Sequence, residues 1–152
     1  MQKIILIALF ISVNTMFINA QITSQSSKSV ITLTKEIFTA QVADMSQKEW
    51  KYLGDKPAII DFYADWCGPC KTMTPIMEEL ATKYKDEIYV YKIDTEAERE
   101  LASLFHVRAI PYFLLIPMNQ APQFMEGAAP KNYMERVIEE YLLEKKEGDK
   151  GN

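Results

Sequence analysis

Two cysteines, Cys67 and Cys70, are the residues whose type and spacing most directly suggest chemistry in this chain. They are the only cysteines among 152 residues, and they stand in the run Trp66-Cys67-Gly68-Pro69-Cys70. Cysteines three positions apart in the first turn of a helix have Cα atoms about 5 Å apart, within the range that a disulfide accepts. The pair can therefore form and open a disulfide without unfolding the chain.

The elements on either side of the pair indicate which sulfur reacts first. The apolar run 57–63 predicts a strand that leads to Cys67, and residues 70–84 show helical periodicity. Free backbone N–H groups and the helix dipole at a helix N-terminus favour a thiolate over a thiol. We therefore expect Cys67 to be the exposed, attacking sulfur and Cys70 to resolve the mixed disulfide.

A structural disulfide and a zinc site are the two alternatives for this pair. A disulfide that closes so short a loop removes little entropy from the unfolded chain, so it stabilises poorly. Zinc needs four ligands, and beyond the two sulfurs the chain has a single histidine, His106. The motif in its strand-to-helix context favours redox chemistry over both, and no metal or cofactor is expected.

Asp61 is the one acidic residue within the otherwise apolar strand predicted at 57–64. A carboxyl group in a strand buried on both faces loses hydration, which raises its pKa and makes it a candidate acid or base. The alternative is an aspartate at a strand end, partly hydrated. We favour the functional interpretation.

The rest of the chain alternates between predicted strands and helices. The expected strands are 30–34, 57–64, 88–94, 110–116 and 122–126, and the expected helices are 35–44, 70–84, 95–105 and 130–145. This order predicts a single α/β domain over residues 30–146, with a central mixed five-stranded β-sheet flanked by about four helices. The last helix is expected to bury Tyr133, Ile138 and Leu142 among others. The connection 45–56 is assigned no function.

Both ends of the chain differ from the predicted domain. Residues 1–20 combine one lysine, an apolar stretch and a final Ile18-Asn19-Ala20, a pattern typical of a cleaved signal peptide. A retained membrane anchor is the alternative. Residues 21–29 are interpreted as a flexible leader and 147–152 as a polar tail. We therefore expect a bacterial periplasmic or secreted protein. The formal net charge of −4, without a basic cluster, argues against nucleic acid as a partner.

The motifs carry a resemblance to a known family. The chain resembles the thioredoxin family, and the resemblance covers about residues 30–145. It is carried by the run Asp61-Phe62-Tyr63-Ala64-Asp65-Trp66-Cys67-Gly68-Pro69-Cys70-Lys71, followed by Pro75, Ala109-Ile110-Pro111 and Gly127. The resemblance implies the thioredoxin fold. It also implies that Asp61 exchanges a proton with Cys70 through water, and that Lys92 lies near Asp61 and modulates it. An exposed strand lysine is the alternative for Lys92.

The resemblance further implies a substrate-binding surface around Cys67. The Ile110-Pro111 bond is cis in that family and lies against the active cysteine, where an X-Pro bond makes the cis form accessible. The residues expected to bind substrate are Trp66, Gly68, Pro69, Ile110, Pro111 and Gly127. These residues would form a flat, uncharged rim around Cys67, which suits many disulfide-containing proteins as substrates.

The dipeptide between the cysteines predicts the direction of electron flow. Gly68-Pro69 supplies no charge that would stabilise a reduced thiolate, so we expect a monomeric protein-disulfide reductase. In an oxidising compartment it would need recharging, which suggests a membrane thiol-electron carrier as donor and exported proteins as substrates. A disulfide oxidase or isomerase, and a non-enzymatic thioredoxin-like binding subunit, are the alternatives.

Overall fold

The computed structural model describes residues 30–44, 46–47 and 49–145, and the predicted signal peptide, leader and polar tail lie outside these ranges. The strands are β1 (Val30–Thr32), β2 (Ala58–Tyr63), β3 (Tyr89–Asp94), β4 (Tyr112–Ile116) and β5 (Gln123–Glu126). The helices are α2 (Lys35–Gln41), α3 (Gly68–Lys83), α4 (Arg99–Leu104) and α5 (Lys131–Arg136), which continues into the π-helical segment η1 (Val137–Leu142).

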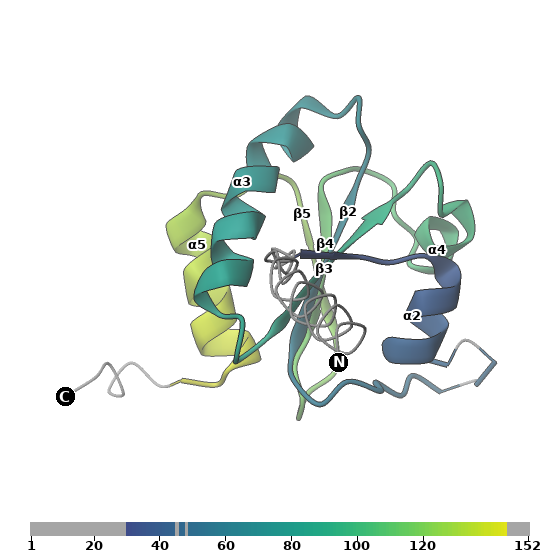
Figure 1. Ribbon diagram of the computed structural model, residues 1–152, viewed down its shortest axis with the longest axis horizontal. Coiled ribbons are helices and arrows are strands. Elements are labelled where there is room, and N and C mark those ends of the chain that lie inside the picture. Colours follow the sequence, from purple (N-terminus) through teal and green to yellow (C-terminus); the bar gives the residue numbers. More distant parts are fainter. Residues whose placement is uncertain (1–29, 45, 48, 146–152) are drawn as a thin grey trace, which may run out of the picture.

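The five strands form one mixed sheet in the order β1-β3-β2-β4-β5, which confirms the predicted fold class. β3 pairs in parallel with both β1 and β2, whereas β4 pairs antiparallel with β2 and β5. Helices α3 and α5 cover one face of the sheet and α2 and α4 cover the other (Figure 1). The central position of β2 explains why its residues are almost all buried.

The strands supply both halves of the hydrophobic core because successive side chains point to opposite faces. Along β2, Ile60 and Phe62 belong to the cluster under α2 and α4, while Ile59 belongs to the cluster under α3 and α5. β4 divides in the same way, with Leu114 on the first side and Phe113 on the second. Every central strand therefore joins the two layers of helices.

Three helices are shorter than their sequence patterns predicted, and the last of them spans 131–142 rather than 130–145. The helix expected at 95–105 begins only at Arg99, because the Asp94 carboxylate accepts the Glu96 N–H at 2.9 Å and holds the preceding residues in a turn. The helix expected at 35–44 ends at Gln41, since Ala43 instead forms a β-bridge with Tyr52. A local side-chain turn and a β-bridge, rather than helix propensity, thus set these two ends.

The last helix buries Ile138 and Leu142, as predicted, but not Tyr133. Met134, Ile138 and Leu142 follow one another at i, i+4 spacing and are buried, whereas Tyr133 is 42% exposed. The expectation that Tyr133 is buried was wrong because that residue lies about 100° around the helix from Met134.

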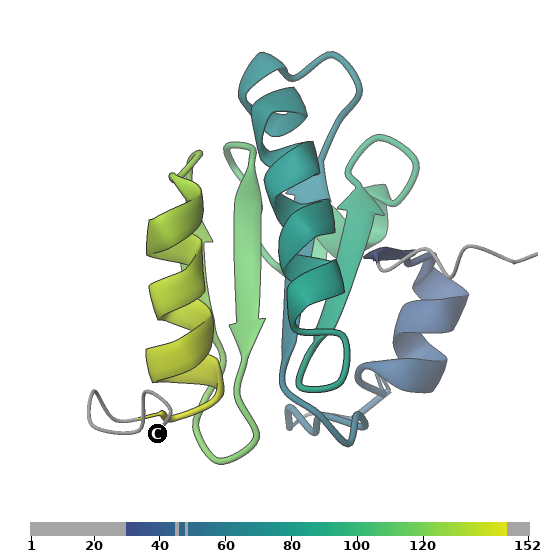
Figure 2. The same ribbon diagram turned by 60° about the vertical axis from the view of Figure 1, so that its left-hand side comes forward.

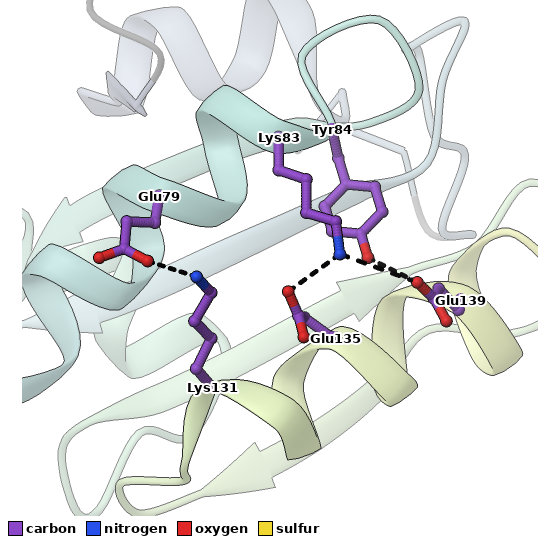
Figure 3. Close-up of polar contacts among 6 residues, drawn as sticks. All are labelled: Glu79, Lys83, Tyr84, Lys131, Glu135 and Glu139. Carbon is purple, nitrogen blue, oxygen red and sulfur yellow. Dashed lines mark hydrogen bonds and ion pairs between the residues drawn. The ribbon is translucent and has the colours of Figure 1, made fainter.

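Ion pairs connect α5 and η1 to α3 along the solvent side of their contact. Figure 3 shows Lys131 opposite Glu79, and Lys83 between Glu135 and Glu139. The Lys83 Nζ to Glu135 Oε1 distance is 2.9 Å. Exposed pairs of this kind contribute about 0–1 kcal/mol each, so the buried apolar contacts dominate the stability of this layer. Over the described ranges, no helix is long and apolar enough to cross a membrane.

Phe38 is expected to be a main determinant of stability on the α2 side. Its side chain is 0% exposed and its ring centroid lies 5.5 Å from that of Phe105. We predict that Phe38→Ala lowers the free energy of unfolding by about 3–5 kcal/mol. Tyr133→Ala, at an exposed aromatic position, should cost less than about 1 kcal/mol. Urea denaturation of the oxidised proteins measures both, and equal losses would contradict the packing described here.

Candidate redox site

The connection from β2 to α3 lies at one end of the sheet (Figure 2). The cysteine pair lies at the α3 end of this connection. Cys67 and Cys70 form a disulfide with a Cα–Cα distance of 5.3 Å, which confirms the spacing inferred from the sequence. The Cys67 N–H donates to the Ala64 carbonyl at 3.1 Å, so the connection turns tightly into the helix. The two sulfurs are therefore held by the first turn of α3.

Cys67 is the N-cap residue of α3, and its sulfur takes the place of a capping oxygen. Its Sγ accepts the backbone N–H of Cys70 at 3.2 Å. Pro69 lies in the first turn, where a missing N–H costs no helix hydrogen bond. An N–H donor and the positive end of the helix dipole thus converge on the Cys67 sulfur, the environment that stabilises a thiolate.

The expectation that Cys67 is exposed was wrong for the oxidised protein. Cys67 is only 3% exposed and packs with Ala64 and Cys70, against which Tyr63 and Ile110 also lie. The Ile110 carbonyl oxygen is 3.8 Å from Cys67 Sγ. The chain segment before Pro111 therefore covers the sulfur on one side, a contact between residues far apart in sequence.

The residues predicted to bind substrate gather around this pair. The Ile110-Pro111 bond is cis, as the resemblance implied. The Pro111 carbonyl accepts the Gly127 N–H at 2.8 Å, which brings Gly127 beside the cis proline. Gly127 has φ 85°, a left-handed conformation that favours glycine. Trp66 is 68% exposed and lines a shared hollow with Ile110. Gly68 and Pro69 are exposed at the start of α3.

Asp61 is buried within β2, as predicted, with 6% of its surface exposed. It alternates with Ile60 and Phe62, so its side chain lies on the α3 side of the sheet, the side that carries Cys70. No hydrogen-bond partner is present for its Oδ1 among the described residues. Burial raises the pKa of Asp61 to about 7, and the charge of Lys92 opposes this shift in part.

Lys92 is the direct neighbour of Asp61 in the parallel pairing of β2 with β3. Its Nζ lies 5.3 Å from the centre of the Tyr63 ring, a cation–π arrangement. In the described part of the chain it forms no ion pair with Asp61, so it acts on the carboxyl group through its field alone. Sequence reasoning missed Tyr63, which contacts both Lys92 and the cysteine cluster.

His106 lies apart from this chemistry, one residue beyond Phe105, the C-cap of α4. It follows α4 with φ 52°, and its N–H donates to the Ser103 carbonyl at 3.0 Å. Within the described residues, no group of three or more His, Cys, Asp or Glu side chains is arranged to hold a metal ion.

Asp61 makes stability depend on pH with a definite sign. Between the unfolded pKa of 3.8 and the folded pKa of about 7, the folded protein keeps a proton that the unfolded chain has lost. Stability is therefore highest below the lower value and falls as pH rises through the upper one. The shift corresponds to about 4 kcal/mol as an upper bound.

We predict that Asp61→Asn stabilises the protein, and that this gain grows between pH 5 and pH 8 because the amide cannot ionise. Urea denaturation at the two pH values measures it. Asp65→Asn, which changes an exposed carboxylate nearby, is the matched control. A gain from Asp61→Asn that is the same at both pH values would contradict the burial of an ionisable group.

Comparison with known proteins agrees with this geometry. The thioredoxin family model matches residues 29–140. A thioredoxin of Borreliella burgdorferi is 43% identical over 113 residues, which cover 74% of this chain and 97% of that protein. Thioredoxin 1 of a Nostoc species is 34% identical over 103 residues, covering 68% and 96% respectively. A chloroplastic thioredoxin Y2 of Arabidopsis thaliana is 44% identical over 88 residues, covering 58% and 53%.

With its Cys-x-x-Cys pair at the N-terminus of α3, this chain is a thiol-disulfide oxidoreductase and belongs to the thioredoxin family.

Proposed function

We propose that the protein reduces disulfides in exported proteins through the dithiol form of Cys67 and Cys70. The observation that carries this proposal is the N–H of Cys70 directed at Cys67 Sγ from the first turn of α3. A thiol in this position loses its proton readily, and the resulting thiolate is the species that attacks disulfides.

The reaction proceeds in two exchanges. The Cys67 thiolate attacks one sulfur of the substrate disulfide, so a mixed disulfide forms and the other substrate sulfur leaves as a thiolate that takes up a proton. The Cys70 thiolate then attacks Cys67 Sγ, which closes the Cys67–Cys70 disulfide and releases the second substrate thiol. Two electrons pass to the substrate, and the protein ends in the oxidised form described here.

Asp61 is the proposed proton acceptor for Cys70. With a pKa of about 7, its carboxyl group is about half ionised at neutral pH and can both take and return a proton. Its position on the α3 side of the sheet supports this role. Lys92 would shift the protonation equilibrium of Asp61, because its charge favours the ionised carboxylate that burial disfavours.

The sequence pattern of residues 1–20 supports export. The family match begins at residue 29, which leaves that segment outside the thioredoxin domain. A reductant in an oxidising compartment must be recharged, and a membrane thiol-electron carrier is the donor we propose. Gly68 and Pro69 place no charge beside the sulfurs, which supports reduction over disulfide formation.

We predict that the purified protein reduces the disulfides of insulin with dithiothreitol as electron donor, and that Cys67→Ser abolishes this turnover because the attacking sulfur is lost. Turbidity of the released insulin chains measures the rate. Titration against glutathione should give a reduction potential of about −270 mV, the value of a thioredoxin-type reductant, rather than about −120 mV, the value of a strong disulfide oxidant. Absence of turnover by the unmodified protein would contradict the reductase assignment.

We further predict that Cys70→Ser, expressed with residues 1–20 intact, accumulates mixed disulfides between Cys67 and its partners. The resolving sulfur is missing, so the first exchange cannot be completed. Mass spectrometry of the captured proteins identifies substrates and donor together, and exported proteins should dominate. The Cys67→Ser, Cys70→Ser double variant is the control for non-covalent capture. Capture of proteins that are not exported would overturn the proposed location.

A further inference from the structure

A hollow of about 610 Å³ adjoins the cysteine pair on the α4 side of Trp66. Trp66 and Ile110 form its border with the redox site. Thr95, residues of α4 and the segment before the cis proline form the rest. The residues that matter for its chemistry are Trp66, Thr95, Arg99, Ser103, Arg108 and Ile110.

Both charged side chains that line this hollow are arginines, Arg99 and Arg108. Among the residues that the structure describes, no carboxylate lines it, although the whole chain carries a net charge of −4. The predicted uncharged rim at Trp66 and Ile110 therefore borders a positively charged hollow on this side. Arg99 stands at the start of α4 and Arg108 in the segment after it, so only the folded chain places the two beside one hollow.

The two guanidinium groups are available to a ligand. Both arginines are exposed, and each ion pair found in the described ranges uses a lysine instead. The hydrogen bond found for the Arg99 side chain runs from Nε to the Glu96 carbonyl, at 3.3 Å. A guanidinium presents further N–H donors in a planar fork that matches a carboxylate.

Three acidic residues near α4, Asp94, Glu98 and Glu100, are engaged with other partners. A Glu98 carboxylate oxygen accepts the Lys35 backbone N–H at 3.1 Å, and Glu100 forms an ion pair with the Lys35 side chain. The Asp94 carboxylate accepts the Glu96 N–H. These contacts hold the carboxylates in the turn before α4 or against α2, and none of them lines the hollow.

The walls of the hollow are fixed to the core. Thr95 donates from both its backbone N–H and its hydroxyl to the Tyr63 carbonyl, at 2.9 Å and 3.1 Å, which ties this side to the end of β2. Phe105, the C-cap residue of α4, packs against Phe38 and Phe62. The backbone that flanks the two arginines is thus held in place before any ligand arrives, which lowers the ordering cost of binding.

We propose that Arg99 and Arg108 form a specificity subsite that selects substrates with acidic side chains next to the attacked cysteine. This inference rests on the proposed reductase function. An extended substrate segment whose cysteine reaches Cys67 would continue past Trp66 and Ile110 and present its Asp or Glu carboxylates to the two guanidinium groups. The attraction between guanidinium groups and carboxylates favours association of substrate and protein, and it leaves the chemistry of the reacting sulfurs unchanged.

Three matched peptides test this proposal with the whole domain in its reduced form. Each is a fluorogenic disulfide whose attacked cysteine is flanked on both sides by two Glu, two Gln or two Lys. The unmodified protein should reduce the Glu peptide with a kcat/KM about 3- to 10-fold above that of the Gln peptide, and the Lys peptide more slowly. Raising the salt concentration to about 0.5 M should shrink these differences.

In the Arg99→Gln, Arg108→Gln double variant, the three rates should agree within about 2-fold, at the Gln-peptide rate of the unmodified protein. Each single variant should lose part of the preference, so the test also holds if the double variant is unstable. Arg136→Gln, an exposed arginine on α5 across the sheet, is the matched control and should keep the full preference. Substitution of both arginines by lysine should restore part of it.

Equal reduction of all three peptides by the unmodified protein would overturn the subsite while the reductase function stands. Persistence of the preference in the double variant would overturn the assignment to these two arginines. Reduction of none of the peptides would instead contradict the proposed function itself.

Discussion

The hydrogen bond from the Cys70 N–H to Cys67 Sγ is the contact on which the rest of this structure depends. It exists because β2 ends at the point where α3 begins, so that a cysteine becomes the N-cap of the helix. The sheet holds β2 in place from both sides, through β3 and β4. Much of the fold can therefore be understood as a rigid support for one helix N-terminus with a sulfur at its tip.

Asp61 lowers the stability of this support. A carboxyl group in the middle of a central strand lacks water, and in the described residues one of its oxygens has no hydrogen-bond partner. Replacing it by an apolar residue would relieve this penalty. Its raised pKa lies near neutral pH, which is what its proposed role as proton acceptor requires. Under that proposal, function and stability are opposed at this position, and the charge of Lys92 reduces the rise in pKa that burial causes.

Specific contacts, some local and some between distant segments, decided the features that sequence patterns missed. The periodicity of 95–105 is helical throughout, yet a local hydrogen bond to the Asp94 side chain keeps the first residues in a turn. Cys67 was expected to be exposed and is covered by the segment at Ile110, 43 residues later. The two arginines of the hollow carry no local signal at all, because an exposed arginine is ordinary in any helix or loop.

The sequence by itself determined the order and type of the elements, the redox pair and the buried aspartate. These depend on local periodicity and on short-range spacing, such as the i, i+3 cysteines at a strand-to-helix junction. Only the tertiary structure decided which loops meet over the sulfur, where helices end and which charges share a hollow. Those features arise from packing between segments far apart along the chain, which a one-dimensional pattern does not encode.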